Sequence, residues 1–166
     1  LLIPQALEEL YAGRGAEAQQ IFESVASVGD QFSNVDLITL GRLGLGQALI
    51  QQGEIAKGIK LLDETMITLE TEEVFPLVNG IVYCAAIEYC RKVWDLERAQ
   101  EWTAALTRWC EEQPDLIPFR GECQVRRAEI LQFHGDWPKA MEETMNACDL
   151  LARNYSESIT GEAYYR

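Results

Sequence analysis

The sequence has little of what active sites and metal centres are usually built from. It contains a single histidine, His134, and five cysteines that form no C-x-x-C pair. No spacing between these residues resembles a structural zinc knuckle. His134 stands just before Gly135 at an expected helix end, where histidine is a common terminal residue. We therefore expect no catalytic residues, no metal and no cofactor, and hence a protein that is not an enzyme.

Basic residues are also scarce. Lysine and arginine together number 14 against 27 aspartates and glutamates, which gives a net charge of −13. Such a chain repels nucleic-acid phosphates and is only weakly attracted to anionic lipid surfaces. No apolar run approaches the roughly 20 residues that a membrane-spanning helix needs. We expect no direct binding of nucleic acid by this segment and no membrane association.

The cysteines fall within helical apolar patterns rather than in loops, which favours reduced thiols in a core. Thiols of this kind suit a reducing compartment, so we expect a cytoplasmic protein. The residues concerned are Cys84, Cys90, Cys110, Cys123 and Cys148.

What the sequence does have is an internal period. A small residue recurs at Gly58, Ala99 and Ala140, with spacings of 99 − 58 = 41 and 140 − 99 = 41. Ala18 marks a weaker earlier copy 40 residues before Gly58, since 58 − 18 = 40. Within each copy the apolar residues fall at steps of three and four, which predicts two amphipathic helices per copy.

These patterns predict an all-α fold of antiparallel helical hairpins in one domain over residues 1–166. We expect repeats at 1–32, 33–73, 74–114 and 115–155, and a partial repeat at 156–166, in a fragment of a longer chain. The expected helices cover 4–12, 15–29, 35–52, 55–70, 76–92, 96–112, 117–134, 137–153 and 158 onward.

Two further features have a packing interpretation. The run Gly41-Arg-Leu-Gly44-Leu-Gly46 looks like a phosphate loop, yet it follows no strand and lies in a helical pattern, so close helix packing explains it better. The tryptophans recur near turns or along second helices, and we expect them to seal one repeat against the next. They are Trp94, Trp102, Trp109 and Trp137.

The pattern resembles the tetratricopeptide repeat. The best match runs from Ala128-Glu-Ile-Leu131 through Gly135-Asp136-Trp137 to Ala140, Thr144 and Ala147. The resemblance implies a right-handed α-α superhelix, a solenoid of antiparallel helical hairpins. The period of 41 exceeds the family's usual period of about 34, and Trp94 replaces the glycine of the turn. This long variant resembles the helical repeat regions of bacterial LuxR-type/ATPase transcriptional regulators.

In such repeats the first helix of each hairpin lines the concave face of the superhelix. Carried over position by position, the resemblance implies a groove with contributions from three repeats. They are Leu43, Gln47, Ile50 and Gln51 in the second repeat, Cys84, Glu88, Arg91 and Lys92 in the third, and Val125, Arg126, Glu129, Gln132 and Phe133 in the fourth.

Three basic residues in this groove, Arg91, Lys92 and Arg126, stand out from an acidic protein. One hypothesis is that they receive a carboxylate-bearing peptide or ligand, because guanidinium groups grip carboxylates with paired hydrogen bonds. The alternative is that arginines at 126 and 127 merely form surface pairs with nearby glutamates. The candidate partners are Glu88, Glu122 and Glu129.

The leading functional prediction is a non-catalytic protein–protein interaction scaffold, a regulatory segment of a larger bacterial signalling or transcription-regulator protein. Its partner would be a protein, a peptide or other domains of the same chain. The alternative is a small-molecule effector-sensing domain that controls a distant DNA-binding domain. A scaffold should retain a polypeptide, whereas a sensor should gain thermal stability from one metabolite.

Overall fold

The computed structural model of the protein describes residues 2–112, 117–133 and 135–154. Within these residues the regular structure consists of eight α-helices and no strand, which confirms the all-α prediction. The predicted helix from residue 158 onward, the partial repeat at 156–166 and His134 lie outside the described residues. The helices are α1 (Leu2–Tyr11), α2 (Gly15–Phe32), α3 (Val35–Gln51), α4 (Ile55–Thr71), α5 (Pro76–Lys92), α6 (Leu96–Glu112), α7 (Ile117–Phe133) and α8 (Trp137–Asn154).

The observed helix bounds follow the predicted ranges closely. The largest difference is at the end of α2, which continues to Phe32 rather than stopping at residue 29. Its last turn is closed by Ser33, whose left-handed backbone directs its N–H to the carbonyl of Asp30. In the described part of the chain, no helix is both long and apolar enough to cross a membrane.

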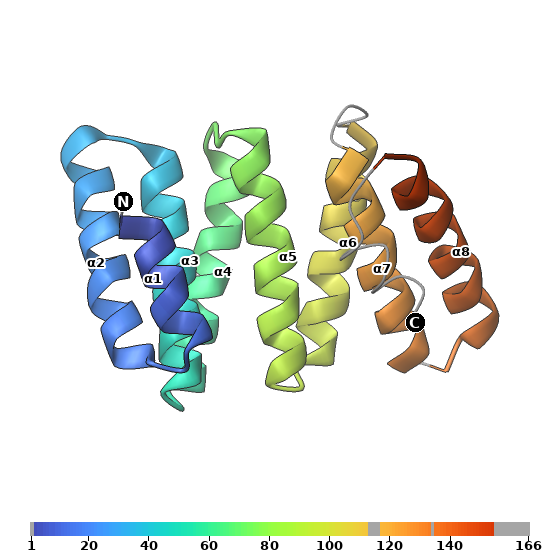
Figure 1. The fold of residues 1–166 in the computed structure, drawn as a ribbon, viewed down its shortest axis with the longest axis horizontal. Helices are drawn as coiled ribbons and strands as arrows, with labels where there is room; N and C mark the ends of the chain where they lie inside the picture. The colour runs from blue at the N-terminus through green and yellow to red at the C-terminus, as the bar shows by residue number, and fades with distance from the viewer. Residues whose placement is uncertain (1, 113–116, 134, 155–166) are drawn as a thin grey trace. The chain divides into compact units, whose positions relative to one another are not determined.

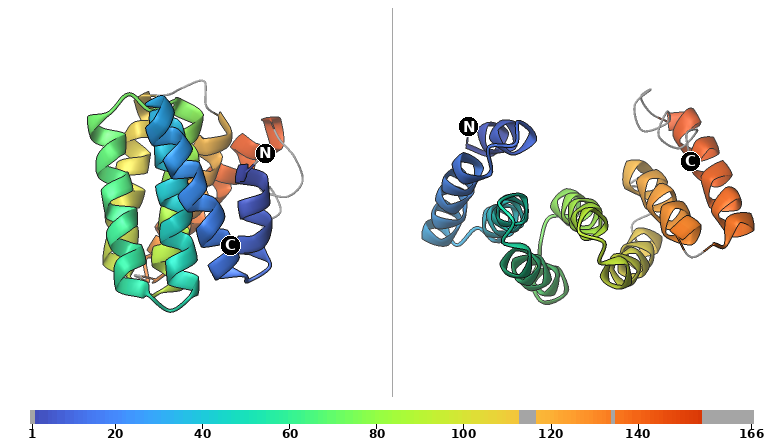
Figure 2. Two further views of the ribbon diagram at one scale, coloured as in Figure 1. Left: turned by 90° about the vertical axis from the view of Figure 1, so that its left-hand side faces the viewer. Right: turned by 90° about the horizontal axis from the view of Figure 1, so that it is seen from below.

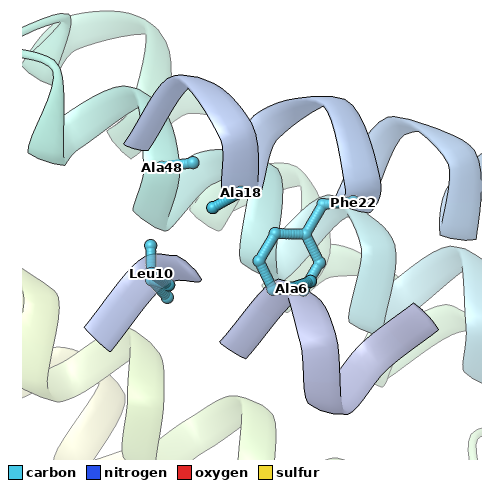
Figure 3. Packing of buried hydrophobic residues seen from close by; sticks show 5 residues of the cluster. All are labelled: Ala6, Leu10, Ala18, Phe22 and Ala48. Carbon is cyan, nitrogen blue, oxygen red and sulfur yellow. The ribbon is translucent and has the colours of Figure 1, made fainter. Parts of the chain in front are cut away.

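The chain divides into two compact units, Leu1–Tyr89 and Cys90–Arg166, with the division near the end of α5. In the first unit, α1 packs on α2, α2 on α3 and α3 on α4, as consecutive antiparallel helices (Figure 1). At one end of this unit, Phe22 of α2 points toward Ala6 of α1 (Figure 3). Leu10, Ala18 and Ala48 complete this buried cluster.

Glycines allow the helices of the first unit to approach closely. A Cβ added to Gly44 would lie 2.2 Å from Cε1 of Phe22, so only glycine leaves room for the phenyl ring. A Cβ at Gly58 of α4 would lie 2.6 Å from the carbonyl oxygen of Gly46 in α3. The glycine-rich run at residues 41–46 therefore serves helix packing, as its position in a helical pattern indicated.

In the second unit, α7 packs against both α6 and α8, and it lies between them in the right-hand view of Figure 2. The recurring small positions are buried here too, because Ala99 and Ala140 are 0% and 2% exposed. A larger side chain at either position would force neighbouring helix axes apart.

The backbone repeats with the sequence. Four turns contain a residue with positive φ, at Gly13, Gly53, Trp94 and Gly135, and the intervals are 40, 41 and 41 residues (53 − 13, 94 − 53 and 135 − 94). Each turn has the same two closing hydrogen bonds, the Schellman pattern that ends many helices. At the third turn, the N–H of Trp94 donates to the carbonyl of Arg91 at 3.0 Å, and the N–H of Asp95 donates to that of Cys90 at 2.9 Å. The period is thus a property of the chain's path as well as of its composition.

Candidate functional site

The predicted groove residues of the first unit are largely buried. Leu43, Gln47 and Ile50 are 4%, 7% and 9% exposed, so their side chains belong to the interior. Gln51 is exposed, but its amide donates to the carbonyl of Leu10 at 2.9 Å and so ties the end of α3 to the preceding hairpin turn. Cys84 is buried and Glu88 is half-buried. These positions offer little surface to a partner.

In the second unit the structure brings predicted groove residues from two helices together around one carboxylate. Glu129 of α7 is 1% exposed and accepts a hydrogen bond from Nη1 of Arg91, at the end of α5. Nη1 of Arg126 lies 3.2 Å from Oε2 of the same carboxylate. Val125, the neighbour of Arg126, is buried at 2% exposure.

The pairing of Arg126 with Glu129 was one of the predicted alternatives, and the structure confirms it. The expectation that such a pair would merely solvate the surface is wrong, because Arg126 is 7% exposed and its partner almost fully buried. Arg127 pairs with Glu143 of α8, Nη2 to Oε1 2.5 Å, and not with any of the predicted glutamates. Helix α8 covers a carboxylate that was outside the range of partners considered from sequence.

This buried ion cluster limits what the basic residues can do. Removing one member of a buried ion pair leaves a charge without compensation, which costs several kcal/mol. Arg91 and Arg126 therefore hold α5 and α7 in register through Glu129. A carboxylate from a partner would have to compete with Glu129 for them, whereas Lys92 is exposed.

Next to this cluster lies an exposed aromatic surface, which we call the aromatic patch and define as Trp94 and Phe133. The two rings meet edge to face, with centroids 6.0 Å apart and planes inclined by 78°. Cζ of Arg91 lies 5.9 Å from the centroid of the Phe133 ring, within cation–π range. Trp94 is 73% exposed and Phe133 47% exposed. Gln132, beside Phe133, is half-buried.

The prediction that all four tryptophans seal the repeats is wrong for two of them. Trp94 and Trp137 are 73% and 64% exposed, whereas Trp102 is buried at 7%. Trp109 is half-buried. Both exposed tryptophans lie at hairpin turns, where the chain leaves one helix and the next helix begins. The signal that could have identified Trp94 is its place in the repeat, because glycine occupies the equivalent turn position at 13, 53 and 135.

The cysteines with described side chains are free thiols buried in the two units, as predicted. Burial raises the pKa of the Cys148 thiol, which lowers the fraction of reactive thiolate at neutral pH. Cys123 has no described side chain. Among the described residues, no group of three or more His, Cys, Asp or Glu side chains is arranged to hold a metal ion.

Comparisons of the chain with protein-family models, with curated proteins and with solved structures gave no match.

Proposed function

We propose that the protein is a non-catalytic interaction scaffold that binds a polypeptide through the aromatic patch. The proposed architecture is a tetratricopeptide-like solenoid with a repeat of about 41 residues, wound as a right-handed superhelix. Its support is the common Schellman turn, which returns at intervals of 40 and 41 residues. Repeats of this kind stack their hairpins and leave side chains of successive hairpins available to a partner.

The observation that carries the proposal is the conformation of Trp94. Its φ of 62° belongs to the left-handed region, where a side chain costs about 1 kcal/mol and glycine costs nothing. Its indole contributes little to the core, because 73% of the residue is exposed. A residue that is unfavourable for the turn and dispensable for the core needs another reason to be there. Tryptophan is the residue most enriched in binding hot spots.

The geometry also indicates what the partner presents. An exposed indole edge-on to a phenyl ring, with a guanidinium over the phenyl face, forms an apolar surface with a cationic side. An apolar or aromatic side chain would bury against this surface and gain about 25 cal/mol for each Å² removed from water. The proposed partner is therefore a peptide or domain with an apolar anchor residue, and Glu129 makes a carboxylate anchor at Arg91 less favourable.

The wider setting is part of the same proposal. We infer a cytoplasmic regulatory segment of a bacterial signalling or transcription-regulator protein, related to the LuxR-type/ATPase group by its long helical repeats. The second candidate, an effector-sensing domain, is favoured by one specific observation, a hollow in the second unit that is large enough for a small molecule. In either case the segment acts by binding rather than by chemistry.

Capture of partners from a lysate of the source organism tests the scaffold, with the protein immobilised and bound polypeptides identified by mass spectrometry. The test variant is Trp94→Gly with Phe133→Ala, which removes both rings and gives the turn its usual residue. The matched control is Phe32→Ala, which removes an aromatic side chain that is 70% exposed in the first unit. A polypeptide retained by the wild type and the control but lost by the test variant supports the proposal. Equal retention by all three overturns the role of the aromatic patch.

A further inference from the structure

The second unit contains a hollow on which neither the aromatic patch nor the buried ion cluster draws. It is formed by α6, α7 and α8 and has a volume of about 490 Å³. Small-molecule sites commonly enclose roughly 300–1,000 Å³. The hollow is thus of a size for a metabolite rather than for a protein surface.

Its lining combines an apolar floor with charged walls. Ala104 of α6 and Ile130 and Leu131 of α7 supply apolar contacts. Three cationic side chains line it against two carboxylates, which leaves one positive charge in excess (3 − 2 = +1) in a chain whose net charge is −13. The cations are Arg108, Arg127 and Lys139, and the carboxylates are Glu142 and Glu143.

The cations differ in how they are engaged. Arg127 is paired with Glu143 across α7 and α8, and Lys139 is paired with Asp136 at 2.7 Å. Arg108 has no ion-pair partner among the residues that the structure describes, and it stands at the edge of the apolar floor. A guanidinium in that position can bind a carboxylate with two parallel hydrogen bonds.

We propose that this hollow binds a small amphipathic carboxylate, with the apolar body on Ala104, Ile130 and Leu131 and the carboxylate on Arg108. The ligand would contact α6 of one hairpin and both helices of the next, α7 and α8. Its binding energy would therefore stabilise the packing between two consecutive hairpins. This goes beyond the scaffold function, because the two sites share no residue and either can exist without the other.

Thermal unfolding and isothermal titration with octanoate test the proposal, and octylammonium serves as the charge-reversed probe. Butyrate and 1-naphthoate extend the range of apolar bodies. We expect at least one carboxylate to raise the thermal midpoint by mass action, and octylammonium to leave it unchanged. Arg108→Gln should weaken the binding of that carboxylate by about tenfold or more, since a hydrogen-bonded ion contact is lost.

Two further variants locate the site. Ala104→Trp fills the hollow from α6 and should abolish binding, while circular dichroism checks that the variant folds. Lys60→Gln removes an exposed cation of α4 in the first unit and should leave binding unchanged. Phe133→Ala should also bind as the wild type does, which separates this site from the aromatic patch. Amide shifts in NMR spectra should cluster at residues 104, 130 and 139.

The proposal is overturned by any of three results. The first is that no carboxylate binds at millimolar concentration. The second is that binding is insensitive to both Arg108→Gln and Ala104→Trp. The third is that octylammonium stabilises the protein as much as octanoate, because the contact with Arg108 would then play no part.

Discussion

The indole of Trp94 lies edge-on to the phenyl ring of Phe133, and its own backbone stands at a φ of 62° where the other three hairpin turns have glycine. The ring contact alone is worth about 0.5–1.5 kcal/mol beyond the area it buries. That gain is similar to the cost of the left-handed backbone, about 1 kcal/mol. The turn therefore gains little net stability from tryptophan, which is why we assign the residue to binding.

The turn conformation predicts an unusual order of stability at position 94. Trp94→Gly should fold with a free energy of unfolding about 1 kcal/mol higher than that of Trp94→Ala, because only glycine adopts this φ without strain. Urea denaturation of the two variants measures the difference. Gly53→Ala, at the equivalent turn with a φ of 87°, should be destabilised by a similar amount. If the alanine variant at 94 is the more stable one, the turn is not strained.

The buried carboxylate predicts a large cost for a small chemical change. Glu129→Gln keeps the shape of the side chain but removes the charge that Arg91 and Arg126 share. We expect it to lower the free energy of unfolding by about 3 kcal/mol or more, as for other broken buried ion pairs. Denaturation in urea at neutral pH provides the measurement.

A more exposed ion pair of the same unit provides the comparison for Glu129. Glu143→Gln disrupts the pair with Arg127, whose side chain is 38% exposed. Solvent screens such a pair, so this variant should lose no more than about 1 kcal/mol. Equal losses for Glu129→Gln and Glu143→Gln would show that burial of the Glu129 cluster does not govern its contribution.

The close approach of α2 and α3 predicts a steric effect at Gly44. An alanine there places its Cβ 2.2 Å from the ring of Phe22, so Gly44→Ala should destabilise the protein by about 1–3 kcal/mol despite alanine's higher helix propensity. The same substitution in a Phe22→Leu background should cost less, since the smaller side chain makes room. A double-mutant cycle by thermal unfolding measures the coupling, and additive effects would contradict the contact.

Burial of Tyr89 predicts loss of stability in strong base. Burial, with smaller contributions from Glu88 and Tyr11, raises the pKa of Tyr89 from 10.0 to about 12. The folded state thus keeps this proton where the unfolded state has lost it. Stability that is fully present below pH 10 should fall between about pH 10 and 12. Absorbance titration at 295 nm should find one tyrosine with the raised pKa, and that step should be absent in Tyr89→Phe.

Much of the fold could be predicted from the sequence because its determinants are local. Gly53 and Gly135 mark turns that only glycine adopts without strain, and small residues such as Gly58 and Ala99 mark places where helices touch. These features recur at fixed spacing, so one copy supports the next. The prediction of eight of the helices needed no long-range information.

The candidate site was harder to predict, because burial depends on how helices pack. Glu129 and Arg126 carry charge and were expected at a solvated groove, yet each compensates the other in the interior. Phe133 was predicted as a groove residue, but its contact with Trp94 joins α7 to the turn after α5, and no short-range pattern encodes that contact. The hollow between α6, α7 and α8 likewise arises only when three helices are in place.

Hydrogen exchange on the protein with and without a captured polypeptide tests the central claim most directly. The account predicts that the partner slows amide exchange at residues 91–95 and 129–133, around Trp94 and Phe133, and that Trp94→Gly with Phe133→Ala abolishes this protection. Protection confined to the first unit, or protection that persists in the double variant, would contradict the assignment of the aromatic patch as the binding surface.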